Sequence, residues 1–204
     1  MGLLSTSVSI TRYKVEGKIE GPVLEVVADG LKRNTINEID NESFDKAVGW
    51  TSLEDPFAPN FDGSSFSIGT HMVFSLRIDK KSIPSKVLQK HFKLAVAKRL
   101  AESGREFLSR NEKTMLKEHV KNTLSLRIPA TPNMYDVIWN YEGGTLLFFS
   151  NQKAANEELE TLFSKSFKLS LIRLFPYTMA DLTAGLGEPE KDVLAKLTPT
   201  KFTE

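Results

Sequence analysis

Lysines recur at every fourth position in residues 109–130, and their ammonium groups could bind phosphate. They are Lys113, Lys117 and Lys121. Side chains four positions apart share one face of a helix, and the apolar residues of this segment have the same spacing. The segment is therefore predicted to be a helix with an apolar and a basic face. Ammonium groups that neutralise phosphates release counterions and give binding that does not depend on base sequence.

A second basic stripe precedes the first, in a helix predicted for residues 85–101 after Ile83-Pro84. At about 100° per residue, its lysines lie opposite an apolar side that includes Leu88 and Phe92. A basic stripe on one helix is ordinarily a solvated surface, but two in succession make phosphate binding an equal alternative. The DNA-binding residues predicted from both stripes and their flanks are Lys86, Lys90, Lys93, Arg105, Arg110, Lys113, Lys117, Lys121 and Arg127.

Charge is unevenly distributed along the 204 residues, although the formal net charge is only +1. Residues 77–127 contain 14 Lys or Arg against 5 Asp or Glu, a balance of +9, and the rest of the chain carries −8. Such segregation is the electrostatic footprint of a polyanion partner such as double-stranded DNA.

Residues that could support catalysis do not converge in the sequence. His71, His91 and His119 lack metal-ligand spacing, and no glycine pattern forms a phosphate-binding loop. Carboxylates of the acidic segment 34–63 could serve a two-metal nuclease, which is kept as an alternative, but they are scattered along a proline-containing connection. No catalytic, cofactor-binding or metal-binding residue is predicted. The acidic candidates are Asp40, Glu42, Asp45, Glu54, Asp55 and Asp62.

Cellular location follows from what the sequence lacks. There is no cysteine, and the N-terminus has no basic region followed by a long apolar stretch. The longest apolar runs are far shorter than the roughly 20 residues that cross a bilayer. The expectation is a cytoplasmic protein without a membrane partner.

The remaining elements predict an α+β protein. Ser109 and Glu112 fit a capping box at the start of the second basic helix. The segments around Gly143-Gly144 form a hairpin, and residues 151–165 form a helix. We expect a mainly antiparallel sheet with helices packed on one side and a two-helix basic protrusion. Residues 1–180 would form one unit, and residues 181–204 a loosely ordered tail with one helical turn near 191–197.

The order of these features resembles the family of the recombination-associated protein RdgC. The matching stretches include Ala47-Val48-Gly49-Trp50, the run Asn111-Glu112-Lys113-Thr114-Met115-Leu116-Lys117-Glu118-His119-Val120, and Ile138-Trp139. The similarity is collinear over about residues 45–178. It implies a non-enzymatic, nucleoid-associated protein that binds duplex DNA with little sequence preference, forms a homodimer and restrains a RecA-type recombinase. The family's exonuclease label has no support in the residues surveyed above.

Two departures from the family pattern change what the resemblance implies. The family's Leu-Leu-Pro-Arg-Ala-Phe run corresponds here to Leu124–Pro129, where Arg127 matches but the phenylalanine is absent. The family also continues through a C-terminal portion that helps to close a ring, so a smaller dimer or an open clamp is expected here. A protein-interaction module that oligomerises without touching DNA is the alternative.

Overall fold

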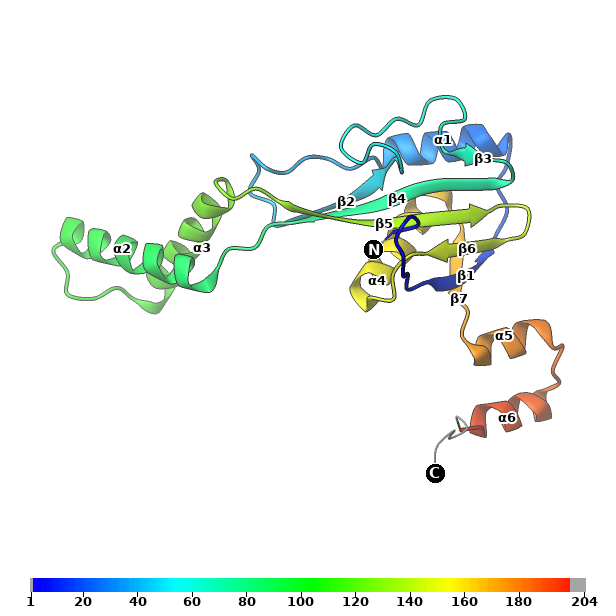
Figure 1. The fold of residues 1–204 in the computed structure, drawn as a ribbon. Coiled ribbons are helices and arrows are strands. Elements are labelled where there is room, and N and C mark those ends of the chain that lie inside the picture. Colours follow the sequence, from blue (N-terminus) through cyan, green and yellow to red (C-terminus); the bar gives the residue numbers. More distant parts are fainter. Residues whose placement is uncertain (1, 199–204) are drawn as a thin grey trace. The chain divides into compact units, whose positions relative to one another are not determined.

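A computed structural model describes residues 2–198 (Figure 1). Helices and strands are interspersed along this part of the chain: β2, β3 and β4 follow one another, and so do α2 and α3. The strands are β1 (Thr11–Glu16), β2 (Lys46–Thr51), β3 (Ser67–Ile68), β4 (His71–Lys80), β5 (Thr131–Asn140), β6 (Thr145–Phe148) and β7 (Ser170–Arg173). The helices are α1 (Val23–Arg33), α2 (Ser85–Ser103), α3 (Arg110–Ser125), α4 (Lys153–Phe167), α5 (Pro176–Thr183) and α6 (Glu188–Lys196).

The sheet has the strand order β2-β4-β5-β6-β1-β7, with β3 paired to β4. The β2–β4, β3–β4, β5–β6, β6–β1 and β1–β7 pairs are antiparallel. Glu142-Gly143-Gly144 turns the β5–β6 hairpin, with Gly144 at a φ of 59° that L side chains rarely adopt. These features confirm the α+β class and the mainly antiparallel sheet expected from the sequence.

The chain divides into two compact units. The first contains residues 1–33, 61–74 and 135–204, and the second contains residues 34–60 and 75–134. Strands β4 and β5 each contribute residues to both units. The predicted boundary at residue 180 stays a prediction.

An aromatic cluster fills the core of the first unit. The ring centroid of Trp139 lies 5.0 Å from that of Phe163 and 5.3 Å from that of Phe167. Helix α1 packs against α4 because Gly30 has no side chain: a Cβ there would lie 2.7 Å from the Phe167 ring. Glycine at position 30 therefore lets the backbone of α1 approach the Phe167 ring of α4 closely.

A polar network ties β1 to α4 and β7 in the same unit. The Tyr13 hydroxyl donates to Asn156 Oδ1 at 2.6 Å and lies 2.8 Å from Glu160 Oε1. Arg173 donates to both the Tyr13 hydroxyl and Glu160, each at 3.2 Å. Burial, the largest cause, raises the pKa of Tyr13 far above its ordinary value. The hydroxyl thus remains protonated and holds the network together.

Strand β2 lies inside the acidic segment that the sequence suggested was only a long connection. Trp50 N–H donates to the Asn34 carbonyl at 2.8 Å, and Ile36 N–H donates to the Trp50 carbonyl at 3.0 Å. The two backbones approach so closely that a Cβ on Gly49 would lie 2.4 Å from Ile36 backbone atoms. The sequence did not predict β2, because a close approach between two backbones produces no periodic pattern of apolar residues.

Two helices follow β7, and the loosely ordered tail expected for residues 181–204 stays a prediction. Helix α5 begins at Pro176, whose fixed φ suits the first turn, and α6 covers Glu188–Lys196, where a single turn was expected. The two helices contact each other. The last six residues of the predicted tail, 199–204, lie outside the described residues.

Candidate nucleic-acid interface

The second basic helix begins at the capping box that the sequence predicts. Ser109 Oγ accepts a hydrogen bond from Glu112 N–H at 3.3 Å, and Glu112 Oε2 accepts one from Ser109 N–H at 2.9 Å. These bonds satisfy two backbone donors that a helix leaves unpaired at its start. The backbone hydrogen bond from Ser109, followed by the Ser109 side chain and Arg105, lowers the pKa of Glu112. Arg105 Nη1 lies 3.1 Å from Glu112 Oε1.

Helices α2 and α3 lie side by side as a hairpin within the second unit (Figure 1). Gly104 ends α2 in the left-handed conformation, with a φ of 64°. Leu108 is buried in the connection between the helices. Val120 and Leu124 are buried on α3, whereas no residue of α2 is fully buried. The apolar side predicted for α2 is therefore only half covered.

Six of the predicted DNA-binding residues are exposed on the hairpin, and none of them forms an ion pair within residues 2–198. Three lysines of α2, Lys86, Lys90 and Lys93, line a shallow depression together with Gln89 and Leu94, and no residue of α3 contributes to it. The six residues are Lys86, Lys90, Lys93, Arg110, Lys113 and Lys117.

The other three predicted residues have different surroundings. Arg105 is paired with Glu112, and Lys121 is paired with Asp45 of the acidic segment. Arg127 follows α3 and is exposed. Internal acids thus neutralise Arg105 and Lys121, while Arg127 remains available. That all nine residues contact DNA stays a prediction.

Arg77 belongs to the basic region by sequence but is buried in the structure. Its guanidinium forms two hydrogen bonds to Asp79, at 2.6 and 2.8 Å, and lies 2.8 Å from Glu38 Oε1. It also lies over the Phe57 ring, 5.0 Å from the centroid. Burial lowers the pKa of Arg77, but the hydrogen bonds to Asp79 and Glu38 outweigh this, so the pKa is raised. Arg77 therefore anchors the acidic segment to β4.

Lys81 is the second buried cation that the sequence reading missed. Its ammonium donates to the carbonyl oxygens of Asp40 at 3.0 Å, Glu42 at 2.7 Å and Ser125 at 2.9 Å. It joins the acidic segment to the last residue of α3. The close spacing of Arg77 and Asp79 in the sequence could have indicated that these two side chains pair. No residue near Lys81 in the sequence indicates which carbonyl oxygens its ammonium binds.

The exposed positive charge is smaller than the sequence count. Five of the 14 cations in residues 77–127 are engaged internally: Arg77, Lys81, Lys98, Arg105 and Lys121. The remaining nine form no ion pair among residues 2–198. They are Lys80, Lys86, Lys90, Lys93, Arg99, Arg110, Lys113, Lys117 and Arg127.

The described residues hold no group of three or more His, Cys, Asp or Glu side chains that could bind a metal ion. His71 starts β4, and its Nδ1 lies 3.3 Å from Thr70 Oγ1. His91 and His119 line the groove between α2 and α3. The predicted absence of a metal site and of a catalytic role stays a prediction.

A family model described as "Putative exonuclease, RdgC" matches residues 9–184. The chain belongs to the RdgC family. Membership confirms the resemblance seen in the sequence and extends it beyond residues 45–178 at both ends. No curated protein matches the chain. No helix within residues 2–198 of this chain is long and apolar enough to cross a membrane.

Proposed function

We propose that this RdgC-family chain binds duplex DNA through its phosphates, without reading base sequence. The observation that supports the proposal is the set of nine exposed cations that form no ion pair among residues 2–198, seven of which lie on the α2–α3 hairpin. Lysine and arginine at such positions neutralise phosphates and release counterions. No compact arrangement of base-reading side chains is required for this mode of binding.

The direct test is binding of random-sequence duplex DNA at several salt concentrations. Each phosphate contact adds about 0.9 to the slope of log affinity against log salt, so the decline is expected to be steep. Lys113→Glu with Lys117→Glu should lower the affinity on every sequence. Lys153→Glu with Lys165→Glu on α4 is the charge-matched control. Undetectable binding at low salt, or an equal loss in both double variants, would refute the proposal.

The proposed cellular role is nucleoid-associated modulation of homologous recombination. A homodimer or open clamp on duplex DNA would restrain a RecA-type recombinase by occupying the duplex that the recombinase must enter. The test is RecA-driven strand exchange with increasing amounts of the protein. Inhibition that disappears with the Lys113→Glu, Lys117→Glu variant would support the role, and equal inhibition by that variant would contradict it.

A protein-interaction module is the second candidate function, favoured by exposed apolar side chains among the cations of the hairpin. These include Leu94 at 59% exposure and Met115 at 70% exposure. A module of this kind would assemble equally well with and without DNA. Light scattering of the full chain in both conditions separates it from the DNA-binding proposal, which predicts assembly on DNA.

We propose that the chain is not an exonuclease, despite the family description. Several carboxylates of the acidic segment hold the chain together: Asp40 accepts from Ala130 N–H, Asp45 pairs with Lys121, and Asp55 accepts from two backbone N–H groups. Converging carboxylates are what two-metal cleavage requires. End-labelled DNA incubated with magnesium or manganese should remain intact, and release of labelled nucleotides would overturn this proposal.

A further inference from the structure

A groove runs between α2 and α3 along one side of the hairpin, and its lining differs from the lysine stripes. Two hollows of about 540 and 340 Å³ share Ala95, Lys98 and His119, which makes the groove continuous. It extends along α2 from His91 to Glu102, a rise of about 17 Å. We propose that this groove binds an acidic amphipathic helix of a partner protein.

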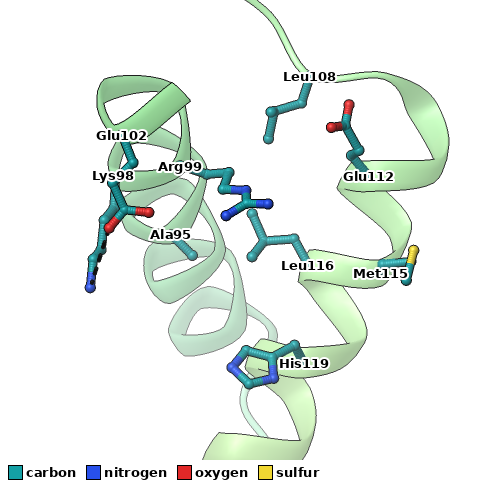
Figure 2. A pocket seen from close by; sticks show the side chains of 9 residues that line it. All are labelled: Ala95, Lys98, Arg99, Glu102, Leu108, Glu112, Met115, Leu116 and His119. Atoms are coloured by element: carbon teal, nitrogen blue, oxygen red, sulfur yellow. Dashed lines mark ion pairs between the residues drawn. The ribbon is translucent and has the colours of Figure 1, made fainter. Parts of the chain in front are cut away.

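The floor of the groove is apolar. Figure 2 shows Arg99 of α2 and Leu116 of α3 pointing toward one another, with Ala95 beside them. No residue of α2 is buried, so the side of α2 that faces the groove keeps apolar area exposed to water. A partner's apolar stripe would bury that area, which favours association. The apolar lining residues are Leu94, Ala95, Leu108, Met115, Leu116, Val120 and Leu124.

The groove is positively charged. Arg99 and Arg127 line it, and neither forms an ion pair among the described residues. The two acids that line it are already neutralised: Glu102 by Lys98 at 3.9 Å and Glu112 by Arg105 at 3.1 Å. Apolar side chains between unpaired cations complement a helix that carries leucine-like residues on one side and carboxylates beside them.

This charge also selects among possible occupants. A second copy of the chain that docked groove against groove would bring its own Arg99 and Arg127 against the same cations, and like charges repel. Duplex DNA would satisfy the cations but would leave the apolar floor uncovered. About three helical turns of an acidic partner match both the length and the chemistry. Arg99 and Arg127 are shared with the proposed phosphate contacts, whereas Lys113 and Lys117 do not line the groove.

The test uses the full chain and a labelled 14-residue peptide with leucines at helical spacing i, i+3, i+4 and i+7 and glutamates elsewhere. Fluorescence anisotropy should show saturable binding. A peptide with the same leucines but lysine in place of glutamate, and a scrambled glutamate peptide, should each bind at least about tenfold more weakly, because each removes one of the two complementary features.

Two variants locate the binding in the groove. Ala95→Glu adds an acid to the groove lining, and Arg99→Glu reverses a charge of that lining. Each should weaken binding of the glutamate peptide about tenfold or more. Arg99→Lys should retain most of the affinity. Lys165→Glu on α4 changes the net charge equally, away from the groove, and should alter affinity less than about twofold. Circular dichroism confirms that each variant keeps its helices.

Three results would overturn the inference: equal binding of the lysine or scrambled peptide, an equal loss in Lys165→Glu and Arg99→Glu, or complete displacement of the peptide by duplex DNA. The last result would assign the groove to DNA. The Lys113→Glu, Lys117→Glu variant separates the two proposals, because it should lose DNA affinity while retaining peptide binding.

Discussion

Lys81 Nζ donates a hydrogen bond to the carbonyl oxygen of Ser125 at 2.9 Å and thereby joins the end of β4 to the last residue of α3. The same ammonium holds the carbonyls of Asp40 and Glu42. One buried side chain thus fixes three separate segments of the second unit. The position of the basic helix α3 depends on this contact.

Lys81→Met is expected to destabilise the fold because it leaves three carbonyl oxygens without their charged donor. Hydrogen bonds to charged groups contribute about 1.5–3 kcal/mol, so the free energy of unfolding should fall by about 2–4 kcal/mol. Urea unfolding measures the change. Lys80→Met, at the exposed neighbouring position, should stay within about 0.5 kcal/mol. Equal midpoints for the two variants would show that the three bonds are not stabilising.

Arg77→Met should be more damaging, because it leaves Asp79 buried without its partner. The Asp79 side chain is 0% exposed, and breaking such a pair costs about 3–5 kcal/mol. Lys153→Met removes an exposed pair with Glu157 on α4 and should cost less than about 1 kcal/mol. Urea unfolding measures the free energy of unfolding of both variants. Equal decreases for Arg77→Met and Lys153→Met would contradict the role assigned to Arg77.

Acid should weaken the start of α3. The pKa of Glu112 lies below its ordinary value of 4.5 in the folded chain. A lowered pKa means that the stabilisation is fully present above the ordinary value and is lost as pH falls through the lowered value. The difference in urea midpoint between the parent protein and Glu112→Gln should therefore be greatest near about pH 7 and shrink below about pH 4. A difference independent of pH would disprove this linkage.

DNA binding should respond more to Lys117 than to Lys121. Lys121 is bound to Asp45 and must leave that carboxylate before it can contact phosphate, whereas Lys117 has no ion pair in the described chain. Lys117→Met should reduce the salt slope by about 0.9, and Lys121→Met by less. DNA affinities measured at several salt concentrations give the two slopes. A greater slope change in Lys121→Met than in Lys117→Met would contradict the prediction.

Local patterns made much of the fold predictable. The Ser109–Glu112 capping box follows from side chains that interact within one turn of a helix. The β5–β6 hairpin follows from its glycine turn. Each of these features depends on residues that are close in sequence, and each appears where the sequence predicts it.

Features that depend on distant residues were missed. β2 is positioned by the backbone around Ile36 and by β4, and the burial of Arg77 and Lys81 depends on segments roughly 20 to 45 residues away. Arg99 in the groove had a usable signal: at about 100° per residue it falls on the same side of α2 as Leu88, Phe92 and Ala95. Counting cations along the sequence did not use that signal, because a count takes no account of which side of the helix a residue occupies.

Strands β4 and β5 are neighbours in the sheet and contribute residues to both compact units. A strand cannot lose its pairing in one half without loosening the ladder of the other, because the same main chain continues through both. Loss of either strand should therefore lower the stability of both units, because each unit contains part of it.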